Sequence, residues 1–102
     1  MQGRTPVGPT SAADGAPSPA PVTVTVRYWA GARAAAGVAT DLLPYAGEVT
    51  VADVLADAAR LHPDLGPVLE VASVLLDGTR AEPGRLLGAG AVVEVLPPFA
   101  GG

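Results

Sequence analysis

The chain ends in two glycines, Gly101 and Gly102, which place its terminal carboxylate on a thread without side chains. Glycine has no Cβ, so the atoms of another molecule can approach its backbone closely. Pro97 and Pro98 stand shortly before, and each proline fixes φ near about −65° and favours extended backbone. Extended, residues 97–102 span roughly 20 Å. Such a terminus fits two interpretations: a reactive carboxylate that enters a partner's active site, or a frayed end of small residues.

The remaining composition limits the chemistry that the chain can perform alone. The sequence has 102 residues, enough for one domain, and no cysteine, which excludes disulfides, thiolate metal sites and a cysteine nucleophile. His62 is the single histidine, so a histidine-based metal cluster is not expected. Ten acidic residues against six basic ones give a net charge of −4. Nucleic acid and anionic membranes are therefore poor partners, whereas a basic protein surface is a suitable one.

The first residues differ from the rest of the chain. Residues 1–21 are rich in Pro, Gly, Ala, Ser and Thr, which predicts a disordered leader, or a translation start placed too far upstream. No apolar stretch follows Arg4, so the leader does not resemble a secretory signal. No apolar run reaches the ~20 residues of a membrane span. A cytoplasmic location without membrane attachment is expected, and the leader is assigned no function.

Alternating residues predict two strands in the first half of the chain. Val22 to Tyr28 alternates strictly, with Val22, Val24, Val26 and Tyr28 on one face. Residues 29–37 are expected to form a loop with a helical turn. Residues 38–44 form a weaker strand that pairs with the first as a hairpin.

A helix is predicted after this hairpin. Thr50 and Asp53 have the spacing of a short capping box at its start. The helix should stop at His62, because Pro63 disfavours helical backbone in the residue before it. The expected apolar stripe is Val51, Val54, Leu55, Ala58 and Leu61.

The last third of the domain reads as short strands joined by turns. Residues 64–70 are expected to be irregular or a helical turn, and residues 71–76 a strand, followed by the hairpin-type turn Asp77-Gly78. Leu86 and Leu87 are expected to point inward. Residues 91–96 form the last strand, which Pro97 ends.

This order of elements predicts an α+β fold. The hairpin, the helix and a crossover to a parallel strand match a β-grasp, or ubiquitin-like, domain in which a mixed sheet packs on one main helix. We therefore divide the chain into the leader (1–21), the β-grasp domain (22–96) and a flexible carrier tail (97–102).

Four segments of the chain carry motifs of one known family. An aromatic-x-x-x-Ala-Arg pattern occurs at Tyr28-Trp-Ala-Gly-Ala-Arg33, with Ala36-Gly37 after it. Two further motifs are the helix start at Thr50–Leu55 and the glycine-punctuated entry to the last strand at Gly88–Val93. The most specific motif is the tail Leu96-Pro-Pro-Phe-Ala-Gly-Gly102. Together these segments resemble the small subunit of molybdopterin synthase, a family related to the thiamine sulfur carriers.

The resemblance implies a sulfur carrier that is not an enzyme alone. A ubiquitin-activating-type partner would use ATP to adenylate the carboxylate of Gly102, and sulfur from a persulfide would displace AMP and leave a thiocarboxylate. The large subunit of molybdopterin synthase would then direct this sulfur into molybdenum cofactor synthesis. Gly101 would supply clearance in a narrow, water-excluding slot. No stably bound cofactor or metal is expected in the chain.

Other residues are assigned to partner binding, each beside a structural alternative. Phe99 is an anchor for a partner pocket or a cap on the domain's own core. Trp29 is a partner contact or a cover for the sheet, and Arg33 a partner contact or a loop-orienting residue. The partner-binding set is completed by Ala100, Pro98 and Pro97. Asp53 and Asp57 lie one helical turn apart, but a solvated face suits them better than a metal site.

Three alternatives to the molybdopterin role remain open. The first is a sulfur carrier for thiamine, or for cysteine or methionine synthesis, since those carriers also end in two glycines. The second is a ubiquitin-like modifier that joins targets through Gly102, which predicts amide-linked adducts. The third is a β-grasp interaction module with an inert tail, for which deletion of Gly101 and Gly102 would change only the length.

Overall fold

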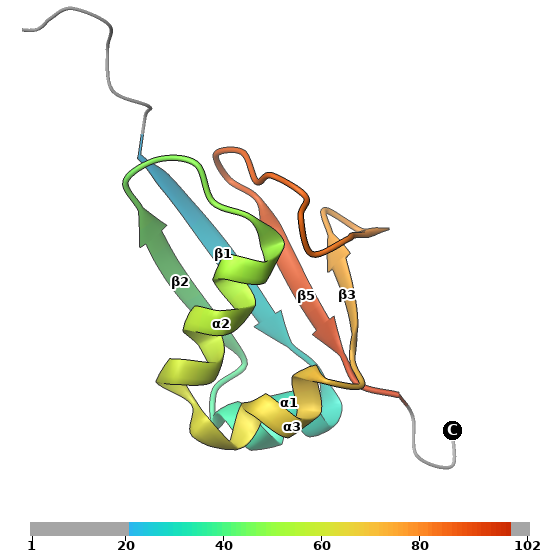
Figure 1. Ribbon diagram of the computed structural model, residues 1–102. Helices are drawn as coiled ribbons and strands as arrows, with labels where there is room; N and C mark the ends of the chain where they lie inside the picture. Colours follow the sequence, from blue (N-terminus) through green and yellow to red (C-terminus); the bar gives the residue numbers. More distant parts are fainter. Residues whose placement is uncertain (1–20, 99–102) are drawn as a thin grey trace, which may run out of the picture.

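The computed structural model describes residues 21–98, which form a single mixed sheet and three short α-helices (Figure 1). Most of the leader and residues 99–102, including Phe99, Ala100, Gly101 and Gly102, lie outside the described residues. The strands are β1 (Val22–Tyr28), β2 (Thr40–Tyr45), β3 (Ser73–Leu76), β4 (Thr79–Arg80) and β5 (Val92–Leu96). The helices are α1 (Ala30–Ala36), α2 (Val51–Leu61) and α3 (Gly66–Leu69), with a 3₁₀ turn, η1 (Pro63–Leu65), before α3.

The strands lie in the order β2-β1-β5-β3-β4. β1 is antiparallel to β2 and parallel to β5, while β3 is antiparallel to both β5 and β4. The expected hairpin and the expected parallel crossover are both confirmed. Because α2 lies across one face of the sheet, the arrangement is the α+β, β-grasp architecture that the order of elements predicts (Figure 1).

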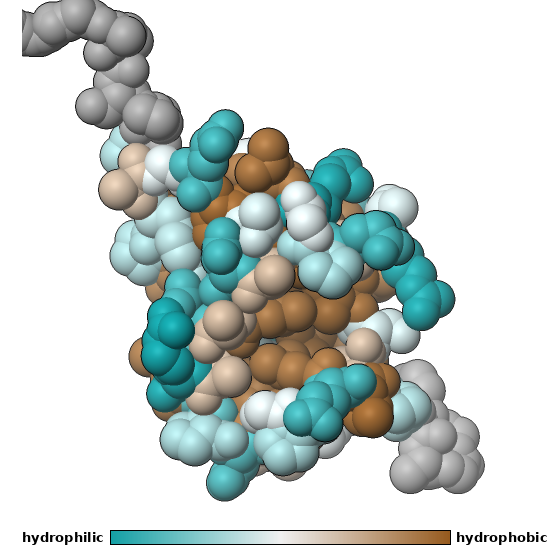
Figure 2. Space-filling view, viewed as in Figure 1, coloured by the Kyte–Doolittle hydropathy of each residue, from teal (hydrophilic) through white to brown (hydrophobic). Residues whose placement is uncertain are grey.

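The two faces of the sheet have different environments, which we call the inner face (toward α2) and the outer face. Val24, Val26 and Val95 are fully buried on the inner face, where they pack with Val54 and Ala58 of α2. Fully burying a side chain of this size stabilises the fold by about 1.5–3 kcal/mol. Figure 2, seen from the α2 side, shows apolar surface beside α2 and polar residues along the outer margin of that helix.

The start of α2 has the predicted cap. The Thr50 hydroxyl accepts a hydrogen bond from the Asp53 backbone N–H at 3.2 Å, and the Asp53 carboxylate accepts one from the Thr50 N–H at 3.0 Å. The hydrogen bond from the Thr50 backbone N–H, followed by an interaction with the Thr50 side chain, lowers the pKa of the exposed Asp53 carboxyl. The helix ends at Leu61, directly before His62 and Pro63, as expected. Leu61 itself was wrongly placed on the buried stripe, since this last helical residue is 55% exposed.

The segment after β1 is more helical than expected. Residues 30–36 form α1 rather than a loop with one turn, because alanine is the strongest helix former and alanines dominate this segment. Gly37 closes the helix in a left-handed conformation (φ 78°), and its N–H donates to the carbonyl of Arg33. This closing turn delays β2, which begins at Thr40 instead of residue 38.

The segments around β3 also differ in detail from the prediction. Residues 63–69 are helical (η1 and α3), and β3 begins at Ser73 because the Val71 N–H still donates to the carbonyl of Val68 at the end of α3. The Asp77-Gly78 turn is confirmed: both residues have positive φ, 50° and 86°, as a tight hairpin turn requires.

A second inward prediction, that for Leu86, was also wrong. Leu87 is buried, but Leu86 is 55% exposed. The segment runs beside the start of α2, where the Val51 N–H donates to the Arg85 carbonyl and the Leu87 N–H donates to the Val49 carbonyl, each at 3.0 Å. Neighbouring side chains of an extended segment point in opposite directions, so only one of the two leucines can reach the core.

Candidate functional site

The carrier tail leaves the domain at the end of the central strand β5. Pro97 directly follows Leu96 and is half-buried, whereas Pro98 is exposed and is the last described residue. Pro97 lies over the start of α1: a Cβ built on Gly31 would stand 3.9 Å from its Cγ atom. The base of the tail is therefore seated on the domain, next to the start of α1.

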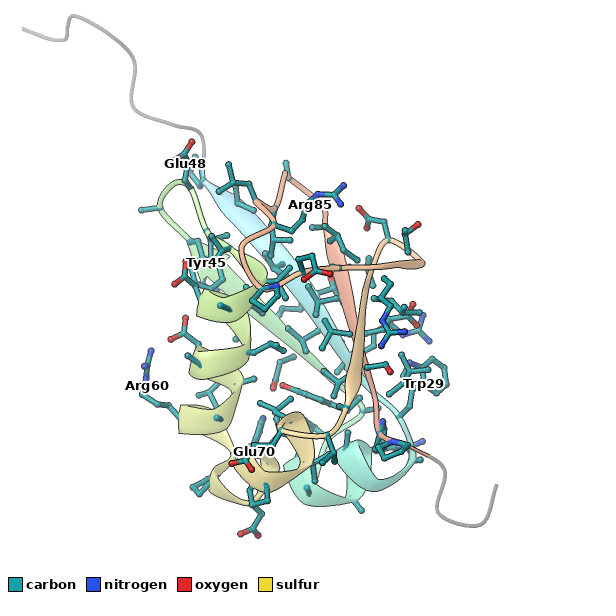
Figure 3. All side chains as sticks on the ribbon, turned by 45° about the vertical axis from the view of Figure 1, so that its right-hand side comes forward. Trp29, Tyr45, Glu48, Arg60, Glu70 and Arg85 are labelled. Carbon is teal, nitrogen blue, oxygen red and sulfur yellow. The ribbon has the colours of Figure 1, made fainter. Side chains whose placement is uncertain are left out.

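Trp29 lies beside this exit. Its backbone N–H donates to the carbonyl of Val95 at 3.2 Å, so the residue is fixed to the strand that leads into the tail. Its side chain is 41% exposed, whereas that of Tyr28 is 2% exposed on the inner face. The two aromatic residues are therefore separated, with Tyr28 in the core and Trp29 at the surface. Figure 3 shows Trp29 at the opposite side of the molecule from Tyr45 and Arg60.

Two charged residues hold the Trp29 ring. The Arg27 guanidinium carbon lies 4.9 Å from the ring centroid, within the range of a cation–π contact. The indole Nε1–H donates to the Glu94 carboxylate at 3.1 Å. Sequence reasoning missed both partners. The alternation of β1 and β5 places Arg27 and Glu94 on the outer face, but their proximity depends on a strand register that one sequence does not provide.

The remaining predicted site residues are divided between the exit and the undescribed tail. Arg33 is exposed on α1 and forms no side-chain hydrogen bond or ion pair within residues 21–98. The structure brings Trp29, Pro97 and the end of β5 together. Phe99, Ala100, Gly101 and Gly102 lie outside the described residues, so their roles stay predictions.

A second polar cluster lies on the inner face and joins β1, β2 and the end of α2. One oxygen of Asp41 accepts from the Tyr28 hydroxyl at 2.7 Å and lies 2.6 Å from Nε2 of His62. Burial raises the pKa of Tyr28 well above its ordinary value, and the hydrogen bond and charge of Asp41 raise it further. His62 is therefore more than a helix-end residue. Asp41, the polar member of an otherwise apolar strand face, was the one signal of this cluster in the sequence.

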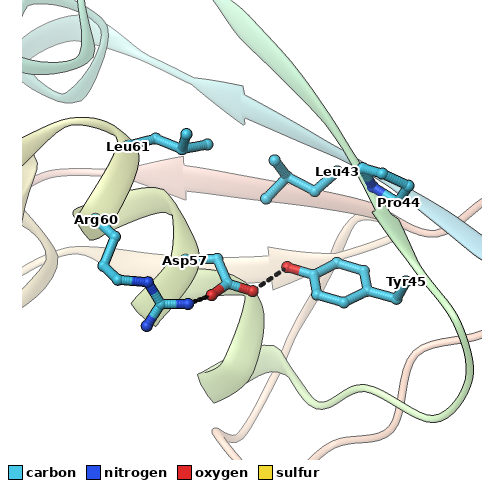
Figure 4. Close-up of a pocket in the computed structure, with 6 residues that line it drawn as sticks. All are labelled: Leu43, Pro44, Tyr45, Asp57, Arg60 and Leu61. Atoms are coloured by element: carbon cyan, nitrogen blue, oxygen red, sulfur yellow. Dashed lines mark hydrogen bonds and ion pairs between the residues drawn. The ribbon is translucent and has the colours of Figure 1, made fainter.

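A shallow pocket of about 290 Å³ opens between β2 and α2 (Figure 4). The Tyr45 hydroxyl donates to Asp57 at 2.7 Å, and Asp57 also forms an ion pair with Arg60. Burial raises the pKa of Tyr45 above its ordinary value. The pocket is lined by Leu43, Pro44, Tyr45, Asp57, Arg60 and Leu61. The Asp57 carboxylate, its one candidate base, is already paired with Arg60, so we assign the tail exit, and not this pocket, as the candidate site.

The acidic residues of α2 do not assemble a metal site. Asp53 caps the helix, and Asp57 bonds to Tyr45 and Arg60. Within residues 21–98, no group of three or more His, Cys, Asp or Glu residues is placed to hold a metal ion. In the same residues, no helix is long and apolar enough to cross a membrane.

A five-stranded mixed sheet in this order, packed on one main helix, is the β-grasp fold of ubiquitin-like proteins. Residues 26–102 match the sequence model of the ThiS family. The chain therefore belongs to the ThiS family, and its class is that of ubiquitin-like sulfur carriers and modifiers. No curated protein sequence is significantly similar to the chain.

Solved structures support the same class. SAMP1 from Haloferax volcanii is 27% identical, with a TM-score of 0.72 over 78% of this chain and 99% of that one. The small archaeal modifier protein 1 (SAMP1) from Methanosarcina acetivorans is 27% identical, with a TM-score of 0.67 over 81% and 99% of the two chains. A third structure, the complex of subunits 1 and 2 of molybdopterin-converting factor from Helicobacter pylori, is 20% identical, with a TM-score of 0.62 over 79% and 100%, and shows the fold alone.

Proposed function

We propose that this chain is the sulfur-carrying small subunit of a molybdopterin synthase. The observation that carries the proposal is the tail itself: in a ThiS-family domain, Gly101 and Gly102 end a segment that leaves the sheet through Pro97 and Pro98. The seated Pro97 supports it, because its contact with the start of α1 fixes the base of this segment on the domain.

The chemistry needs an activated Gly102. A carboxylate is a poor acyl donor, and adenylation by a ubiquitin-activating-type enzyme converts one of its oxygens into a good leaving group at the cost of ATP. The outer sulfur of a persulfide then displaces AMP and forms an acyl disulfide. A thiol reduces this S–S bond, is itself oxidised to a disulfide, and leaves a thiocarboxylate that donates sulfur to a molybdopterin precursor. Gly101 gives the clearance for a slot that excludes water.

The partner surface is the outer face around the tail exit. Trp29 stands there as an exposed aromatic residue of the type that dominates interface energetics. Pro98, Phe99 and Ala100 would then follow into the partner's cleft. The Helicobacter pylori structure supports a large-subunit partner for this chain, because in it a protein of the same fold is complexed with subunit 2 of molybdopterin-converting factor.

The test is the intact mass of untagged protein that has been co-expressed with its activating enzyme and a sulfur source. We expect a mass increase equal to the exchange of one oxygen for sulfur, mapped to Gly102. The variant that lacks Gly102 should stay unmodified, although it folds. An unmodified wild-type protein, under conditions in which a known carrier is converted, would contradict the proposal.

A ubiquitin-like modifier is the second candidate function. It is favoured by the two modifier proteins of the same fold, which are each 27% identical to this chain. A modifier forms amide bonds from Gly102 to amino groups of other proteins, so discrete larger adducts would appear in the same experiment. Restoration of molybdenum cofactor synthesis in cells that lack the small subunit would separate the two, since only the sulfur carrier restores it.

A further inference from the structure

The Trp29 side chain is exposed and yet held from two directions. Arg27 lies over the ring, with its guanidinium carbon 4.9 Å from the centroid, and Glu94 accepts the indole N–H at 3.1 Å. The Trp29 backbone is fixed as well, through its N–H donated to Val95. A merely exposed tryptophan needs none of these contacts. We refer to Arg27, Trp29 and Glu94 together as the tryptophan clamp.

The register of the sheet builds the clamp. In the parallel pair β1–β5, Arg27 is the direct neighbour of Glu94, and both residues point to the outer face. Two such residues side by side would ordinarily form an ion pair. In this protein the Glu94 carboxylate instead takes the Trp29 N–H, and the guanidinium of Arg27 lies over the ring.

We infer that Arg27 and Glu94 are positioning residues that hold Trp29 in its binding pose before the partner arrives; the inference rests on the proposed function, in which a large subunit docks on this face. An interface must otherwise order a mobile side chain when it forms, and that ordering weakens binding. A ring already fixed in the free protein avoids the loss. Trp29 is then the main contact residue. Glu94 acts through it alone, whereas Arg27 both holds the ring and faces the partner.

The clamp also indicates the chemistry of the partner surface. Within residues 21–98 the Arg27 guanidinium has no carboxylate in ion-pair contact. Arg80 lies on the same face, because it pairs in register with Leu75 and Leu75 with Glu94. In a chain of net charge −4, this face therefore carries two arginines, of which Arg27 lies against the Trp29 ring, together with the Glu94 carboxylate that accepts the indole N–H. The fitting partner is a protein with an apolar slot for Trp29 and a carboxylate at the rim of that slot, beside Arg27.

The first half of the test uses the free protein. Trp29 is the single tryptophan, so its fluorescence anisotropy decay reports its motion without a label. Arg27→Ala and Glu94→Ala should each increase the rapid motion of the ring. Glu94→Gln keeps an oxygen acceptor and should remain close to wild type. The matched control is Arg85→Ala, which removes the same charge from an exposed loop position. Equal ring motion in all these variants would overturn the clamp.

The second half measures association with the cognate large subunit. We expect Trp29→Ala to weaken binding at least tenfold, and Arg27→Ala or Glu94→Ala by about two- to tenfold. Glu94→Gln and Arg85→Ala should bind like wild type, and this pattern is one that a general loss of stability would not produce. If the wild-type chain does not bind the large subunit, the proposed function fails. If it binds and all variants bind equally, the role of the clamp is refuted while the proposed function stands.

Discussion

Adjacent residues of this protein serve opposite faces of one sheet. Tyr28 and Leu43 point to the inner face, where they are 2% and 9% exposed, whereas their neighbours Trp29 and Leu42 are 41% and 66% exposed. Polar groups on the inner face are bonded within the domain, as Tyr28 is to Asp41. On the outer face, the polar groups around Trp29 hold an exposed ring.

The difference shows where stability and recognition are located. On the inner face, the apolar side chains pack against α2 and the polar groups are hydrogen-bonded within the domain. Substitutions there should therefore lower the free energy of unfolding. The outer face retains exposed apolar and cationic side chains near the tail. Changes there should affect partner binding while they alter the free energy of unfolding little.

The largest effect is expected for neighbouring leucines of β2. Leu43→Ala removes a buried side chain and should lower the free energy of unfolding by about 2–5 kcal/mol. Leu42→Ala, one residue away on the outer face, should change it by less than about 0.5 kcal/mol. Urea unfolding followed by circular dichroism measures both. Similar losses for the two variants would mean that the outer face is covered in solution.

The next effect concerns the Tyr28 hydroxyl. Tyr28→Phe deletes the hydrogen bond to Asp41, whose carboxylate lies in a half-buried site with His62, and should cost about 1.5–3 kcal/mol. Tyr45→Phe is the control, because the Tyr45 hydroxyl bonds to Asp57 at the margin of the open pocket and should cost less. The urea unfolding midpoints of the two variants measure both losses. A larger loss of stability for Tyr45→Phe would contradict the prediction that the Tyr28–Asp41 bond is the more stabilising of the two.

Tyr28 should also make the stability of the protein depend on pH under alkaline conditions. A tyrosine in the unfolded chain loses its proton at about pH 10, whereas burial and Asp41 raise the pKa of Tyr28 in the folded protein. Above that pH the unfolded state therefore binds fewer protons than the folded state, and stability falls as pH rises. We expect the stability deficit of Tyr28→Phe to shrink at high pH. A deficit that stays constant in urea unfolding across this range would contradict the raised pKa.

The fold could be predicted from the sequence because each main element carries a local signal. The alternation of β1, the Thr50 cap of α2 and the Asp77-Gly78 turn all depend on residues close together in the chain. The error at Leu86 occurred because tertiary contacts determine which way its side chain points. Leu86 faces out because its segment runs beside the start of α2. The extent of α1 was underestimated because alanine-rich segments without an apolar stripe give no helical periodicity.

The candidate site could be predicted only in part. The tail residues and Trp29 have types that suggest chemistry or binding by themselves. The positioning role of Arg27 and Glu94 could not be predicted, because it requires the parallel register of β1 and β5, and residues 65 positions or more apart meet only in the folded sheet. The same holds for Asp41 and His62, which are joined across β2 and the end of α2.

A smaller effect on stability is expected for the exposed aromatic residue. Trp29→Ala removes one cation–π contact and one exposed hydrogen bond, and should lower the free energy of unfolding by about 1–2 kcal/mol. Its effect on binding to the large subunit should exceed its effect on folding. Urea unfolding and titration calorimetry of the same protein give the two values. If folding is affected more than binding, Trp29 covers the sheet and does not contact the partner.

The smallest effects are expected at the junction where the chain passes from the outer-face Trp29 into α1. Ala30 has a positive φ of 48°, which favours glycine, while Gly31 lies within the helix, which favours alanine. Ala30→Gly and Gly31→Ala should each raise the free energy of unfolding by about 0.5 kcal/mol. The added Cβ at Gly31 would meet Pro97 only at 3.9 Å, an ordinary contact. If Ala30→Gly is more stable but binds the partner more weakly, the left-handed backbone at residue 30 helps to position Trp29. If Ala30→Gly is less stable than wild type, Ala30 is not strained.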